Sequence, residues 1–135
     1  MLGEQIGEET GQIIGTRVLP DEGAGPKVEV SFQASGTLLG IHGNNMGTYV
    51  SAARPDGTFF IEGQGIAMND QGDVVTWRGQ GVGRPTGHGM ATSSRGAVYC
   101  QTTSERFARL NGIALVYESE ADESGKVTTK SWEWK

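Results

Sequence analysis

Polar and apolar side chains alternate without interruption from Val28 to Ser35. Successive side chains of a β-strand point to opposite faces, so this pattern predicts a strand with one buried face. Comparable runs recur between turn signals such as Arg54-Pro55-Asp56-Gly57. The sequence therefore predicts strands near residues 5–18, 27–39, 46–54, 58–69, 73–84, 89–102, 113–121 and 126–134, joined mostly by short connections.

Short connections make neighbouring strands antiparallel, and eight such strands in succession favour closure. The expected fold is all-β: a single antiparallel meander β-barrel of about eight strands, formed by residues 1–135 as one domain. Only Ser104–Leu110 has a helical pattern, with Ser104 as N-cap, Phe107 and Leu110 three residues apart, and Gly112 as a stop. We expect this short helix, just before the last hairpin, to plug one end of the barrel.

Composition supports the same fold class. The chain has 135 residues, and β-branched residues far outnumber leucine, which favours strands over helices. Glycine contributes 22 residues, yet glycine and proline together stay below the ~25% that marks low-complexity disorder.

Charge and cysteine content exclude several classes of partner. The net charge is -5 and no basic cluster occurs, so we expect no nucleic-acid partner. Apolar runs are far too short for a membrane helix, so we expect no membrane partner. The single cysteine, Cys100, has no internal disulfide partner, and the N-terminus lacks a signal-peptide pattern. These features favour a cytoplasmic location.

One predicted hairpin contains a short internal sequence repeat. The segment Glu62–Ile66 (EGQGI) is repeated sixteen residues later as Arg78–Val82 (RGQGV). If Asp70-Gln71-Gly72 forms a three-residue turn with a positive φ at Gly72, Asn69 lies opposite Asp73. The same register then gathers four polar side chains on one face, here called the polar quartet: Glu62, Gln64, Arg78 and Gln80.

The opposite face of this hairpin is rich in glycine and places Trp77 against Gly65, so that the indole can cover bare backbone. The pattern does not decide which face is inside. The quartet is either a solvated surface or a lining of the lumen. In the second case Glu62 is the candidate general acid or base, and Arg78 holds it ionised or binds an oxyanion. Gln64, Gln80 and Trp77 are then expected to bind the ligand.

Other signals for chemistry are weaker. His88 lies in a glycine-rich connection, Gly81–Gly89, and is a further candidate to contact a ligand at the barrel rim. That connection departs from the nucleotide-loop pattern because Thr86 replaces its third glycine. Neither His88 nor His42 has a second ligand at metal spacing, so we expect no metal and no cofactor. Cys100 is interpreted as a buried small hydrophobe.

Two indoles alternate in the last predicted strand, at Trp132 and Trp134. Large aromatic side chains at alternate positions anchor either a core or an interface, and we favour the core.

This layout, together with Arg109-Leu110-Asn111-Gly112-Ile113 leading into the seventh strand, resembles the allene-oxide-cyclase-like barrels, in particular their small bacterial members of uncharacterised function. The resemblance covers most of the chain in layout. It implies a mostly apolar lumen that folds a flexible substrate, and oligomerisation through the barrel wall. The polar site residues of those enzymes match no positions here, so no catalytic role is carried over.

We therefore expect the chain to bind a small, largely apolar molecule in the lumen, because a barrel of eight strands can just hold one small ligand. One alternative is an isomerase or cyclase in which the lumen shapes the substrate and Glu62 moves a proton. Another is a structural or assembly module whose lumen is filled by side chains. Fold class does not choose among these functions.

Overall fold

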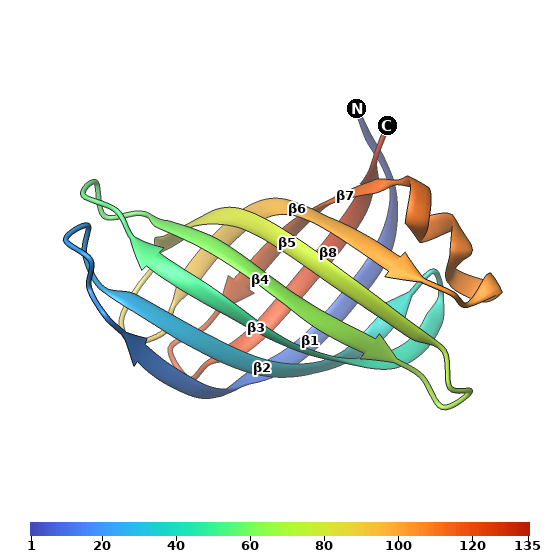
Figure 1. Ribbon diagram of the computed structural model, residues 1–135, viewed down its shortest axis with the longest axis horizontal. Coiled ribbons are helices and arrows are strands. Elements are labelled where there is room, and N and C mark those ends of the chain that lie inside the picture. Colours follow the sequence, from blue (N-terminus) through green and yellow to red (C-terminus); the bar gives the residue numbers. More distant parts are fainter.

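The eight strands of the chain form one closed barrel in sequence order, with the first strand hydrogen-bonded to the last (Figure 1). The computed structural model describes all residues, Met1–Lys135. All neighbours are antiparallel, which confirms the predicted meander barrel. The strands are β1 (Leu2–Leu19), β2 (Lys27–Leu38), β3 (Ile41–Ala53), β4 (Phe59–Met68), β5 (Val74–Pro85), β6 (Thr92–Thr102), β7 (Ala114–Ala121) and β8 (Lys126–Trp134).

Strand β3 begins five residues before the predicted start. The connection from β2 is only Leu39-Gly40, both with positive φ, so pairing resumes at once with Leu38 opposite Ile41. The added segment contains Gly43, Asn44 and Asn45, residue types that are depleted in strands. Hydrogen bonding to β2 and β4 on both sides overrides that weak local preference.

The short helix closes one end of the barrel, as predicted. It is a 3-10 helix, η1 (Glu105–Gly112), which includes the glycine that was expected to stop it. Ser104 precedes the helix, but its hydroxyl donates to Asp73 Oδ1 at 2.6 Å and does not cap a backbone N–H. The buried plug consists of Phe107 and Leu110 with Ile6, Val75 and Leu115. The two chain ends lie beside each other at this same end (Figure 1).

The hairpin of β4 and β5 has the predicted register. Gly72 has a φ of +83°, Glu62 lies opposite Gln80, and Gly65 lies opposite Trp77. A β-carbon at Gly65 would stand 2.4 Å from the Trp77 indole and 2.5 Å from the Met46 carbonyl oxygen. Glycine at this position therefore lets the indole lie directly on the strand.

The outer wall carries the two C-terminal indoles. In β8 the inward positions are Val127, Thr129 and Ser131, which line the lumen, so Trp132 and Trp134 lie on the outside. Trp134 is 57% exposed. The expectation that these indoles belong to the core is wrong, because the alternation of β8 turns Val127, Thr129 and Ser131 to the lumen and both indoles outward.

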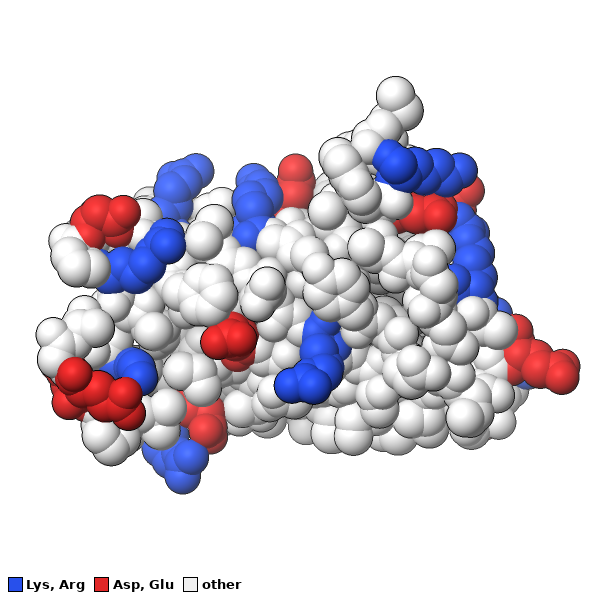
Figure 2. Space-filling model, turned by 45° about the horizontal axis from the view of Figure 1, so that its top comes forward, with Lys and Arg blue, Asp and Glu red and all other residues white.

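No helix of the chain has the length and apolar character needed to cross a membrane. On the face shown in Figure 2, charged side chains of both signs are more numerous towards the two ends of the barrel, and a few stand apart from one another in its middle.

Candidate functional site

The lumen contains a cavity of about 220 Å³. This exceeds the ~150 Å³ of an engineered apolar cavity that holds benzene. The cavity extends from Phe107 and Leu115, at the plugged end, to Thr92 and Ala121 beside the connections at the other end. The interior of the barrel is therefore hollow enough for a molecule somewhat larger than a single aromatic ring.

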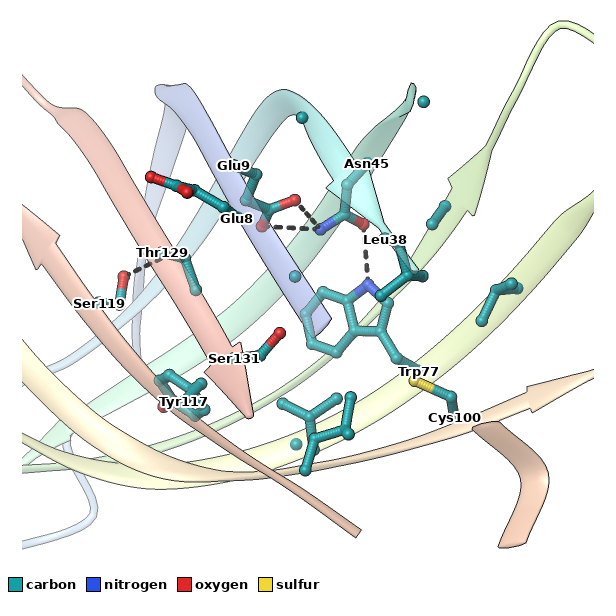
Figure 3. Close-up of a pocket in the computed structure, with 18 of the residues that line it drawn as sticks. Glu8, Glu9, Leu38, Asn45, Trp77, Cys100, Tyr117, Ser119, Thr129 and Ser131 are labelled. Carbon is teal, nitrogen blue, oxygen red and sulfur yellow. Dashed lines mark hydrogen bonds between the residues drawn. The ribbon is translucent and has the colours of Figure 1, made fainter. Parts of the chain in front are cut away.

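Three side chains from three strands form a hydrogen-bonded chain across the lumen (Figure 3). Trp77 Nε1 of β5 donates to Asn45 Oδ1 of β3 at 2.8 Å. Asn45 Nδ2 in turn donates to the Glu9 carboxylate of β1, at 3.1 Å from Oε1 and 3.2 Å from Oε2. An indole N–H can only donate, so it fixes the amide oxygen towards Trp77 and the amide nitrogen towards Glu9.

Glu9 is the acidic group of this hydrogen-bonded chain. Of the other acidic residues among the lining, Glu8 is exposed and Asp73 is bonded to Asn69, Ser104 and Arg106. Burial raises the pKa of its carboxyl above the usual range, and the hydrogen bond from Asn45 offsets part of that rise. Desolvation disfavours the charged form of a carboxyl, which explains the direction. Glu9 is thus a group whose proton is held more tightly than that of a surface carboxylate.

Aromatic rings continue along the wall from Trp77. The Phe32 ring centre lies 6.2 Å from that of Trp77 and 6.1 Å from that of Tyr49, in tilted arrangements. These distances fall within the range that favours aromatic pairs. The three rings, from β5, β2 and β3, form one continuous apolar surface of the lumen, here called the aromatic wall.

The side of the lumen formed by β7 and β8 is richer in hydroxyl groups. Ser119 and Thr129 share a hydrogen bond of 2.9 Å, and Ser131 lies near them on β8 (Figure 3). Burial raises the pKa of Tyr117, against a hydrogen bond with Ser94 that lowers it. Burial, with a smaller contribution from nearby Tyr117, raises the pKa of Tyr49 to about 12. Both phenols are therefore neutral donors at physiological pH.

Cys100 also lines the lumen, beside Trp77 in the register of β5 and β6. Burial raises the pKa of its thiol to about 11. The reactive species of cysteine is the thiolate, so this thiol is a weak nucleophile and acts as a small apolar lining group.

The polar quartet is on the outside. All four side chains, Glu62, Gln64, Arg78 and Gln80, are exposed and border a depression of the outer wall together with Tyr99 and Gln101. The structure brings the quartet together as the register predicts, but the alternative that it lines the lumen is wrong. A β-carbon at Gly63 would lie 2.6 Å from both the Thr48 carbonyl oxygen and the Tyr49 β-carbon.

Gly63 and Gly79, on the other face of the same strands, line the cavity, so the glycine face is the inner one. The roles expected for Glu62 and Arg78 in catalysis, and for Gln64 and Gln80 in binding, depended on the lumen. Glu62, Gln64 and Arg78 are not among the residues that line the cavity, and Gln80, which is among them, has an exposed side chain.

Of the other expected site residues, Trp77 does line the cavity. His88 is exposed in the connection between β5 and β6, where its carbonyl accepts the Ala91 N–H at 3.2 Å, and it does not line the cavity.

Sequence reasoning missed Glu9 and Asn45. The alternation of β1 is broken by irregular pairing with β8 between Gln5 and Gly7, where both Ile6 and Gly7 are buried. A bulge of this kind shifts which positions face inward, so the pattern around Glu8-Glu9 is not readable from period alone. Asn45 was missed because β3 was predicted to begin after it.

No group of three or more His, Cys, Asp or Glu side chains is close enough to hold a metal ion.

Comparisons with known proteins support the architecture and no specific activity. No family model matches the chain, and no curated protein matches it. Solved structures match almost the whole chain at low sequence identity, including the following three. A conserved protein of unknown function from Rhodopseudomonas palustris is 15% identical, covering 98% of this chain and 97% of that one, with a TM-score of 0.83.

A protein of unknown function from Clostridium acetobutylicum is 14% identical, with 98% of each chain covered and a TM-score of 0.84. A β-barrel-like protein from Acinetobacter baumannii is 12% identical, covering 100% of this chain and 96% of that one, with a TM-score of 0.83. At these identities the similarity shows the fold alone. The chain is thus similar to small β-barrel proteins of unknown function, and none of these matches names the allene-oxide-cyclase-like group.

Proposed function

We propose that the protein binds a small, largely apolar molecule in the lumen of its barrel. The observation that carries this proposal is the combination of a cavity of about 220 Å³, an aromatic wall and one polar end at Glu9 and Asn45. Ligand sites typically pair such an apolar lining with a few placed polar groups. The remaining cavity also argues against the alternative of a lumen filled by side chains.

Filling the lumen tests this proposal. Val98 lines the cavity on β6, and Ala97, the preceding residue, points to the outer face. We expect Val98→Phe to weaken binding of benzyl alcohol at least about tenfold, because the added ring occupies the ligand's space. The matched Ala97→Phe variant should bind as the wild type does. Isothermal titration calorimetry measures both, with near-ultraviolet circular dichroism as the check on folding.

Equal binding by both variants, or no binding of benzyl alcohol to the wild type at millimolar concentration, would remove the lumen as the site.

A second candidate function is isomerisation by proton transfer, for which Glu9 takes the place expected for Glu62. The supporting observation is that a carboxyl group with a raised pKa faces an apolar cavity, the environment that suits a general acid or base. Deuterium exchange from heavy water at the carbon beside the carbonyl group of phenylacetone tests it. Wild-type exchange no faster than that of Glu9→Gln would exclude this role.

A further inference from the structure

Glu9 is half-buried and has fewer partners than a carboxylate largely removed from water needs. Its two oxygens offer about four acceptor positions, and the single donor group that reaches them is the Asn45 amide. The ion pairs of the chain involve other acidic residues and leave Glu9 without a cationic partner. The carboxylate therefore faces the cavity with most of its hydrogen-bonding capacity unused.

The cavity supplies no compensating positive charge. Its lining contains no lysine and no arginine. The one histidine among the lining residues, His42, lies three positions before Asn45 in β3, so its exposed side chain is on the opposite face of that strand. A lumen with a carboxylate and no cation repels anions and is completed by a positively charged group.

The aromatic wall favours the same kind of ligand. Asn45 bonds both the carboxylate and the Trp77 indole, so the acidic group and the largest ring of the wall share one amide. The faces of tryptophan, tyrosine and phenylalanine rings attract cations, most strongly where water is excluded. The hydrogen bond from Nε1 to Asn45 also fixes the indole in place, so it does not need to be ordered when a ligand enters.

From these observations we infer that the lumen takes a small protonated amine with an apolar body, its ammonium group bonded to the Glu9 carboxylate and its body against Phe32, Tyr49 and Trp77. This inference rests on the proposed binding function and names its ligand class. The cavity volume of about 220 Å³ sets the size of the body at roughly one aromatic ring with a short chain.

The raised pKa of Glu9 has a consequence for such a ligand. An ammonium group favours the ionised carboxyl, so binding of an amine drives the proton off any Glu9 that is protonated. Below the raised pKa, the amine must displace that proton and binds more weakly. A neutral ligand of the same shape carries no such penalty.

A matched pair of ligands tests the inference. Benzylamine and benzyl alcohol differ mainly in the charge of one group. Isothermal titration calorimetry at pH 7 should show benzylamine binding the wild type at least about tenfold more tightly than benzyl alcohol, as a charge-assisted hydrogen bond replaces a neutral one. Glu9→Gln should abolish that preference while benzyl alcohol binding stays within about threefold of the wild type.

Glu62→Gln is the matched control, because it makes the same carboxylate-to-amide change on the outer wall. It should keep the full preference for benzylamine. The wild type supplies a second measurement that needs no variant: the ratio of the two affinities should rise with pH as Glu9 ionises.

The outcomes distinguish failure of the amine inference from failure of the proposed binding function. If benzyl alcohol binds and benzylamine binds no better, the amine inference is overturned and the lumen remains a binding site. If neither binds at millimolar concentration, the binding function itself is overturned. A benzylamine preference that survives in Glu9→Gln, or that is lost in Glu62→Gln, would place the attraction elsewhere and overturn the inference. A ratio of affinities that does not change with pH would do the same.

Discussion

The two faces of the hairpin of β4 and β5 differ in a way that reverses the obvious interpretation of their residues. The outer face carries the polar quartet, whose side chains have the chemistry of a site but lie against solvent. The inner face is mostly glycine around Trp77 and has almost no chemistry of its own. That bare face leaves space for the cavity. In a narrow barrel, positions without side chains are thus as informative about a site as polar ones.

The same contrast separates two carboxylates. Glu62 stands on the outer wall, and Glu9 faces the lumen and is bonded by Asn45. Both are glutamates on strands: Glu62 stands between Ile61 and Gly63, and Glu9 stands between Glu8 and Thr10. The inward face of the curved sheet, where β2 alone separates β1 from β3, distinguishes the environment of Glu9 from that of Glu62.

The largest change in stability is expected when a side chain is added on the inner face of the hairpin of β4 and β5. In Gly65→Val, the new side chain would overlap the Trp77 indole and the Met46 carbonyl oxygen. We expect a loss of about 3 kcal/mol or more in the free energy of unfolding, or failure to fold, because overpacking against backbone cannot relax easily. Urea denaturation followed by circular dichroism measures this change.

The neighbouring variant Gln64→Val puts the same side chain on the outer face, and it should change the free energy of unfolding by no more than about 0.5 kcal/mol. Similar losses in the two variants would contradict the assignment of inner and outer faces.

A smaller effect is expected in the dependence of the free energy of unfolding on pH. The pKa of Glu9 is raised in the folded protein, so over the range between its unfolded and folded values the native state holds a proton that the unfolded chain has lost. The free energy of unfolding contributed by Glu9 therefore falls as pH rises through that range and is constant above it. Asp73, whose pKa is lowered by hydrogen bonds from Ser104 and Asn69, acts with the opposite sign, and its contribution is lost in acid.

Denaturation of Glu9→Gln measured from pH 4 to pH 8 isolates this contribution. Relative to the wild type, the variant should gain stability as pH rises, because glutamine has no charge to desolvate. Glu62→Gln makes the same change on the outer wall and is measured beside it as the matched control. A constant difference between Glu9→Gln and the wild type would show that the Glu9 carboxyl titrates as a solvated group does.

Much of the fold follows from local sequence signals. The turn Asp70-Gln71-Gly72 sets the register of β4 and β5, and the pair Gly65 and Trp77 follows from it. The short segment around Phe107 and Leu110 is predicted as a plug from spacing alone. These features depend on residues close in sequence or on the pairing of two neighbouring strands. Local patterns of polar and apolar residues predict both kinds of feature well.

The candidate site depends on features that the pattern does not contain. When one face of a hairpin is polar and the other is glycine, alternation with a period of two residues does not indicate which face is buried. Glu9, Asn45 and Trp77 come from three alternate strands, β1, β3 and β5, and meet where the inward face of the curved sheet brings their side chains together. The bulge near Ile6 further shifts the inward positions of β1, so no local signal marks Glu9 as a lining residue.

The central claim is that a ligand occupies the lumen, and the three tryptophans of the chain allow it to be tested directly. Trp77 lies in the lumen, and Trp132 and Trp134 lie on the outer wall of β8. In protein labelled with 5-fluorotryptophan, and with the Trp77 resonance assigned from Trp77→Phe, fluorine NMR should show benzyl alcohol shifting that resonance while the other two stay fixed. Shifts confined to Trp132 and Trp134, or an unmoved Trp77 at saturating ligand, would contradict the account.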